Sequence, residues 1–229
     1  RARRFCKVAM RPPLDCTAAS LTRRSLLAVF PALALMPPPR AWGIELPDTE
    51  PEPARRLLAL CEGRRPSSWT AAEIEQSGID ALVDEVASLQ APWPRAALTG
   101  KWKLAYLQPG PNGAGVDRRI PFPEFDFNDS FQRFDIDAGT VVNIAELLGP
   151  RLVVNVRGSL QEADPSVASA PKRFRALIDR GEICARDGPC LPLPISGEGI
   201  FDGVYLGPRL RIGQNLNGGG ARIVQVRVE

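Results

Sequence analysis

The stretch Leu98-Thr-Gly100-Lys-Trp102-Lys-Leu-Ala-Tyr106 decides how the second half of this chain folds. Large apolar side chains occupy every second position from Trp102 to Tyr106, and this two-residue period predicts a strand with one buried face. Gly100 lets such a strand turn in tightly at the closed end of a barrel. The indole of Trp102 would fill that end, and its N–H would need a hydrogen-bond partner.

Short segments with the same alternation continue to the C-terminus. They cover residues 131–137, 140–147, 152–160, 172–178, 195–201, 206–212 and 221–228. Turn residues separate them at intervals of roughly ten residues, which is typical of an antiparallel barrel or sandwich. The run Asn217-Gly-Gly-Gly220 predicts a hairpin before the last segment. In that last segment Arg222, Gln225 and Arg227 are expected to be exposed. The fold class predicted for residues 98–229 is therefore a mainly β, antiparallel barrel.

Two short helices are expected before the barrel, within residues 54–91. The first covers residues 54–61, and its Cys61 is expected to be buried as a small hydrophobe. Thr70 and Glu73 have the spacing of a capping box, and apolar residues at helical intervals behind them predict one amphipathic helix over residues 71–90. One face of this helix should pack on the barrel. Residues 44–53, rich in proline and acid, are expected to be a linker.

These segments, taken in order, resemble the plastid-lipid-associated (fibrillin) family. The matching parts are the helical pair and residues 100–106, 130–135, 139–143 and 201–212. The resemblance implies one PAP/fibrillin domain over residues 54–229, with a lipocalin-like barrel that holds or coats apolar molecules. The chain departs from the family after Leu206, where Gly207 stands in place of an acidic residue, and after Ile212, where Gly213-Gln-Asn215 replaces Ser-Arg-Gly. No role is assigned to these positions.

Aromatic side chains are the candidates for contact with an apolar ligand. Six are singled out as lipid-binding candidates: Trp102, Tyr106, Phe131, Phe134, Phe201 and Tyr205. Either Arg211 or Arg227 is expected to stack on Trp102. Five of the nine phenylalanines lie in residues 122–134, where they form either a flap over the barrel or an edge strand packed on the 71–90 helix. Core packing is the competing interpretation for Trp102.

Charge is unevenly distributed along the chain. Residues 1–43 hold eight of the 29 Lys and Arg residues but only one of the 26 acids, Asp15, so the remaining residues are mildly acidic. Residues 1–22 resemble an organelle transit peptide, and Arg23-Arg24 precede an apolar run that is typical of an export signal. We expect plastid (chloroplast) targeting to the thylakoid lumen or thylakoid membrane, with Ile44 as the mature start. A single transit peptide is the alternative.

The composition excludes several function classes. The chain has no histidine, which removes Ser-His-Asp and Cys-His catalysis and His-ligated zinc. Basic residues of the folded part are scattered, so no nucleic-acid partner is expected. The aspartates near residue 130 lack the spacing of a calcium loop, and no cofactor or metal is expected. We therefore predict that the protein is not an enzyme.

Two cysteines flank a turn sequence, Ala-Arg-Asp-Gly-Pro. Cys184 and Cys190 either close a small disulfide loop, as an oxidising compartment would favour, or remain two unpaired thiols.

Taken together, the sequence predicts a protein that binds a lipid or isoprenoid in its barrel at a thylakoid membrane or plastoglobule surface. The alternative is a structural protein that docks to a thylakoid complex or lipid droplet without a ligand. Turnover of an isoprenoid substrate is the third hypothesis.

Overall fold

The computed structural model describes residues 49–111, 128–217 and 219–229. Nine strands lie within these ranges: β1 Gly100–Gln108, β2 Ser130–Asp135, β3 Thr140–Glu146, β4 Leu152–Glu162, β5 Lys172–Ala185, β6 Cys190–Leu193, β7 Gly197–Leu206, β8 Leu210–Asn215 and β9 Arg222–Arg227. Every pairing between them is antiparallel.

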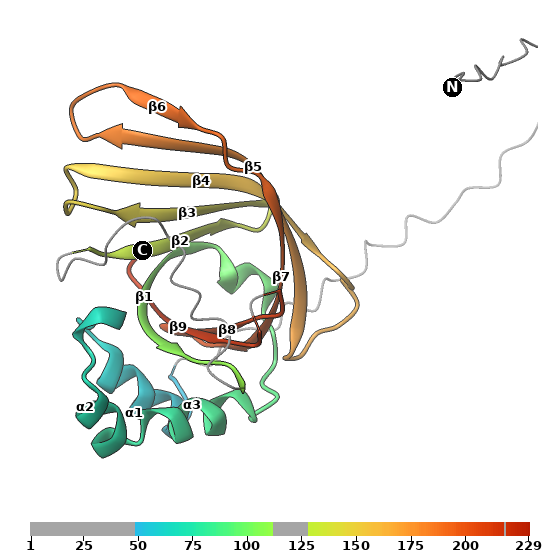
Figure 1. Cartoon of the computed structure of the whole chain (residues 1–229). Coiled ribbons are helices and arrows are strands. Elements are labelled where there is room, and N and C mark those ends of the chain that lie inside the picture. The colour runs from blue at the N-terminus through green and yellow to red at the C-terminus, as the bar shows by residue number, and fades with distance from the viewer. Residues whose placement is uncertain (1–48, 112–127, 218) are drawn as a thin grey trace, which may run out of the picture. The chain divides into compact units, whose positions relative to one another are not determined.

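Eight of these strands close into a barrel. The order β4-β3-β2-β1-β9-β8-β7-β5 returns to its start because β5 also pairs with β4. Closure leaves these eight strands without a free edge. Strand β6 pairs only with β5, and Figure 1 shows this hairpin extending beyond the ring of strands. The prediction of a mainly β, antiparallel barrel is confirmed.

Three α-helices precede the barrel: α1 Glu52–Cys61, α2 Ala71–Ser77 and α3 Ile79–Ala87. The short 3-10 segment η1 Pro66–Ser68 lies between α1 and α2, and a second one, η2 Arg95–Leu98, lies between α3 and β1. The capping box of Thr70 and Glu73 is present at the start of α2. The prediction of a single helix over residues 71–90 is wrong, because Gly78 adopts the left-handed conformation (φ 63°) and ends α2 there.

The helices cover one outer side of the barrel. In Figure 1, α1 to α3 lie against the side formed by β1, β8 and β9. Apolar side chains of α1 and α3 pack there on Val224, Val226 and Ile212. Cys61 is buried in this layer, as predicted. A second apolar cluster lies inside the barrel around Trp102 and Phe174. The molecule therefore has two cores, one on each face of the same strands.

This double burial corrects the prediction for β9. Gln225 is only 1% exposed, although the sequence pattern placed it on a solvent face together with Arg222 and Arg227. Alternate residues of β9 face the helices and the barrel interior, so neither face of the strand is solvated along its length. An alternating pattern cannot distinguish a polar residue in water from a polar residue inside a barrel.

The predicted strand over residues 206–212 is also wrong. The chain reverses at Gly207–Arg209, between β7 and β8. The Glu50 carboxylate accepts hydrogen bonds from the backbone N–H groups of Arg209 (2.8 Å) and Leu210 (2.9 Å) and from the Tyr205 hydroxyl. A Cβ at position 207 would stand 2.0 Å from that carboxylate, so any larger residue here would displace the Glu50 side chain. An acidic group thus does lie at this turn, but it comes from residue 50.

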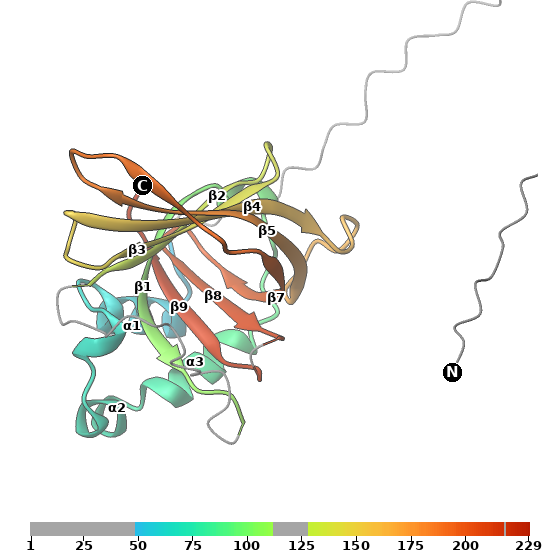
Figure 2. The same ribbon diagram turned by 45° about the horizontal axis from the view of Figure 1, so that its top comes forward.

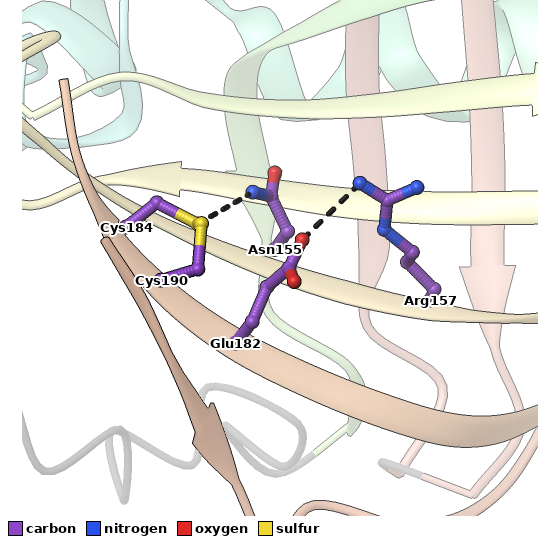
Figure 3. The surroundings of a disulfide bond; sticks show 5 residues. All are labelled: Asn155, Arg157, Glu182, Cys184 and Cys190. Atoms are coloured by element: carbon purple, nitrogen blue, oxygen red, sulfur yellow. Dashed lines mark hydrogen bonds and ion pairs between the residues drawn. A yellow bond between two sulfur atoms is a disulfide. The ribbon is translucent and has the colours of Figure 1, made fainter. Parts of the chain in front are cut away.

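Cys184 on β5 and Cys190 on β6 are joined by a disulfide. Figure 3 shows the bond beside Asn155 of β4, whose side-chain N–H group lies 3.9 Å from the Cys184 sulfur. Next to it, Arg157 and Glu182 form an ion pair across β4 and β5. The register places these side chains on the outer face, because the neighbouring residues Val154 and Val156 face inward.

Candidate functional site

The interior of the barrel is the candidate site. Residues that face inward follow from the register, starting at Trp102, which pairs with Gln132 on β2 and Arg227 on β9. Figure 2 shows β7, β8 and β9 on one side of this interior and β4 and β5 on the other. Side chains from all eight strands therefore converge on one space.

One end of the interior is filled. Trp102, Phe134 and Phe174 are fully buried there, and the segment η2 closes the end with Leu98. The Trp102 indole N–H donates a 3.0 Å hydrogen bond to the Leu98 carbonyl. The indole N–H therefore has the hydrogen-bond partner that the sequence analysis expected it to need.

Arg227 holds the filled end together. Its guanidinium lies 4.2 Å from the centre of the Trp102 ring, so of the two arginines expected to stack on this tryptophan, Arg227 does so. It also donates hydrogen bonds to three backbone carbonyls, those of Pro208 (2.9 Å), Thr99 (2.9 Å) and Ala97. Burial lowers the pKa of Arg227.

The other end of the interior is accessible. On β3 the inward residues change from buried Val141 to partly exposed Asn143 and Ala145. The same trend is seen from Phe134 to Gln132 on β2, from Ala176 to Ile178 on β5 and from Trp102 to Leu104 on β1. Partial exposure of residues that face the inside of a closed barrel means that solvent reaches them through this end. We refer to it as the mouth.

Two glycines of β7 line the interior at the mouth. Gly197 and Gly199 pair with the inward residues Ile178 and Ala176, and a Cβ added at either glycine would meet no atom within 4 Å. Open space therefore lies beside β7 on the inner face. By register, the apolar residues Leu104, Val156 and Ile223 also face inward on β1, β4 and β9.

A charged side chain, Arg211, lies between the filled end and the mouth. It is only 1% exposed, and its guanidinium carbon lies 4.3 Å from the ring centre of Phe134 and 5.6 Å from that of Phe201. One nitrogen, Nη1, donates hydrogen bonds to the side-chain oxygens of Gln132 (3.0 Å) and Gln225. Gln132 in turn donates to Asn143 over 2.8 Å. A chain of polar groups thus crosses the barrel at this level.

Arg211 has no opposite charge beside it. Among the described residues no carboxylate forms an ion pair with it, and burial alone lowers the pKa of its guanidinium. Its Nε is buried and has no hydrogen-bond partner. Both hydrogen bonds of Arg211 use Nη1, so among the described residues neither Nε nor Nη2 has an acceptor.

The structure places three of the six predicted lipid-binding residues in the barrel interior, Trp102, Phe134 and Phe201. Tyr106 and Tyr205 lie instead on the outer face, under the helices. A β-bulge between Leu104 and Tyr106 shifts Tyr106 outward. Its hydroxyl donates to Asp80 (2.7 Å), and burial together with this carboxylate raises the pKa of Tyr106.

Phe131 also faces outward, because it alternates with the inward residue Gln132. Its ring lies 4.7 Å from the Lys101 ammonium group. Phe122, Phe125 and Phe127, which formed the rest of the predicted flap, lie outside the described residues.

Two pockets open on the outer surface next to the tyrosines. The larger, about 700 Å³, is bounded by Tyr106, Trp69 and Ile74, and the smaller, about 340 Å³, by Tyr205 and Glu50. At these pockets the Trp69 indole donates to the Ala105 carbonyl and the Tyr205 hydroxyl to Glu50.

The polar set of the interior was missed by sequence reasoning. Gln225 is the cross-strand neighbour of Arg211 on β9, whereas Gln132 and Asn143 stand on β2 and β3 and reach this level only through the curvature of the barrel. The one local signal is a polar residue at some inward positions of these strands, which is also seen on a solvated face.

The described residues offer little for metal or nucleophilic chemistry. Within them, the group close enough to hold a metal is Glu182 with Cys184 and Cys190, and both sulfurs are bonded to each other. Burial raises the pKa of the Cys61 thiol to about 12, so it stays protonated and is a poor nucleophile.

Within the described part of the chain, no helix is long and apolar enough to cross a bilayer.

A scan against models of known protein families and a search of curated proteins found no match to this chain.

Proposed function

We propose that this protein is a non-enzymatic carrier that binds one apolar molecule, a lipid or isoprenoid, inside a lipocalin-like barrel. The observation that carries the proposal is the change in burial of the inward-facing residues from one end of the barrel to the other. The inner face is filled and fully buried at the end that holds Trp102, and it is partly exposed, with open space beside Gly199, at the mouth. A barrel of eight strands has room for one small ligand.

Burial of the ligand drives binding. An apolar chain that leaves water gains about 25 cal/mol per Å² of buried surface. The inward aliphatic side chains Leu104, Val156 and Ile223 provide apolar contacts for it. Phe201 packs against the apolar cluster of the filled end. The sequence resemblance to the plastid-lipid-associated family supports the same function. We propose that the protein acts at a thylakoid membrane or plastoglobule surface in the plastid.

Native mass spectrometry of the full chain, after incubation with a thylakoid lipid extract, tests the proposal. We expect a one-to-one lipid adduct with the wild-type protein. The variant Gly199→Phe puts a large ring into the open space of the interior and should lose the adduct at least tenfold. The matched control is Leu177→Phe, on the outer face of β5, where the native side chain is already 52% exposed.

Two results would count against the proposal. An adduct that persists in Gly199→Phe would place the lipid outside the barrel. Absence of a discrete adduct from the wild-type protein would reject carriage altogether. The second result would favour the docking function, for which exposed apolar side chains such as Leu191 (62%) of β6 are candidates.

A further inference from the structure

Among the described residues, Arg211 is a buried cation inside the barrel without an ionic partner. Removing a guanidinium from water without a counter-charge is costly, and proteins normally compensate buried charges with a partner. Both arginines lie against aromatic rings, but three nitrogens of Arg227 donate to three carbonyls, whereas Arg211 donates to two amide oxygens from Nη1 alone. The remaining donors of Arg211 therefore call for an acceptor that the described residues do not supply.

The free donors have a defined geometry. Nε and Nη2 point from the same edge of the planar guanidinium, which is the edge that binds a carboxylate through two parallel hydrogen bonds. This molecule uses the same edge elsewhere. On the outer surface, Arg173 donates from Nε (2.8 Å) and Nη2 (2.9 Å) to the two carboxylate oxygens of Asp202. A carboxylate of a ligand fits the corresponding edge of Arg211.

The surroundings select the rest of the ligand. Gly213 lets the guanidinium lie close to the backbone of β8, because a Cβ there would stand only 3.3 Å from Nη2. Phe134 and Phe201 border the arginine, and aliphatic residues such as Ile223 lie between it and the mouth. One cationic edge matches one negative charge, and the apolar surroundings match a hydrocarbon chain. A doubly charged phosphate would leave charge unpaired in this setting.

We infer that the ligand is a long-chain monocarboxylic acid that enters the barrel head first and pairs its carboxylate with the Nε and Nη2 groups of Arg211, its chain extending toward the mouth. This inference rests on the proposed carrier function and makes it specific. It excludes neutral pigments and sterol-like alcohols as preferred ligands, because they bring no charge to the buried guanidinium.

Isothermal titration calorimetry of the full chain with dodecanoate and with 1-dodecanol at pH 8 tests the inference. The two probes have the same number of carbon atoms and differ at the terminal carbon, which is a carboxylate in one and a primary alcohol in the other. We expect the wild-type protein to bind dodecanoate at least tenfold more tightly. Arg211→Met, which keeps length and removes charge, should abolish this preference while 1-dodecanol still binds. Arg211→Lys should retain part of it. Arg175→Met, on the outer face of β5, is the control and should behave as wild type.

Failures of the two proposals give different results. Equal affinity for both probes in the wild type, or a preference for dodecanoate that survives in Arg211→Met, would overturn the carboxylate inference and leave the carrier function standing. Absence of binding of either probe to the wild type would overturn both. If Arg211→Met fails to fold, the Arg211→Lys and wild-type titrations still decide the head-group preference.

Discussion

Two arginines on neighbouring strands, Arg211 of β8 and Arg227 of β9, face the same interior and have opposite surroundings. Arg227 lies at the filled end, where three backbone carbonyls and the face of Trp102 satisfy its guanidinium. Arg211 lies closer to the mouth, more deeply buried, with Nε unpaired. We expect Arg227, whose donors all have acceptors, to stabilise the fold, and Arg211, whose donors are only partly paired, to bind the ligand.

The same contrast separates the two ends of the barrel. The filled end also contains a buried ammonium group, that of Lys172, which pairs with Glu162 over 2.8 Å and donates to two backbone carbonyls. Cations at this end have partners inside the protein. We therefore expect substitutions at the filled end to change stability and substitution of Arg211 to change binding.

The largest expected effect is that of Trp102→Ala. Removing a fully buried indole leaves a cavity and a Leu98 carbonyl without its donor, which should lower the free energy of unfolding by about 3–5 kcal/mol. Urea denaturation measures this loss. Phe131→Ala, on the outer face, is the control and should cost about 1 kcal/mol or less. Similar losses for both variants would contradict a filled end built on Trp102.

The second effect compares the two arginines directly. Arg227→Met leaves three carbonyls without a charged donor and should lower the free energy of unfolding by about 2–4 kcal/mol. Arg211→Met removes an uncompensated buried charge, and we expect no loss of stability, or a small gain. Chemical denaturation of both variants without lipid measures the difference. A loss for Arg211→Met as large as that for Arg227→Met would show that Arg211 is a structural residue.

The smallest effect concerns the paired cation Lys172. Burial alone would raise the pKa of Glu162, but hydrogen bonds and charge from Lys172 and Arg95 outweigh it and hold the pKa below its ordinary value of 4.5. A carboxyl with a lowered folded pKa adds stability above its unfolded pKa, and this contribution is lost as the pH falls through the folded value.

Glu162→Gln should accordingly cost about 2 kcal/mol at pH 7, since Lys172 keeps its two carbonyl acceptors. The difference in the free energy of unfolding between variant and wild type should decrease as the pH is lowered from 4.5 towards 3. Denaturation at pH 7 and pH 3 measures it. An equal difference at pH 7 and pH 3 would mean that the Glu162–Lys172 ion pair does not stabilise the filled end.

The sequence predicted those features that depend on neighbouring residues. The two-residue period around Trp102 identified β1, and the run from Asn217 to Gly220 identified the hairpin before β9, because strand and turn preferences act over a few residues. The break at Gly78 and the turn at Gly207 were missed. In both places, a glycine within a regular pattern decided the local structure.

The candidate site was only partly predictable. Trp102, Phe134 and Phe201 were found because aromatic residues in an alternating strand are expected to be buried. Tyr106 and Tyr205 looked equivalent in sequence, but β-bulges in β1 and β7 change which face of the strand is inside. A single shifted residue reverses the facing of every later side chain, and the sequence pattern does not register it.

The sequence by itself determined a chain of short alternating strands, a mainly β antiparallel fold and the lack of any histidine-based chemistry. The tertiary structure alone decided which face of each strand is interior. Since helices cover β1, β8 and β9 from outside, both faces of these strands are largely buried, and the local pattern is ambiguous there. The curvature of the barrel then brings Gln132 of β2 to Arg211, which is already paired with Gln225 across β8 and β9. Their meeting depends on strand register, which is a property of the whole barrel and not of any one segment.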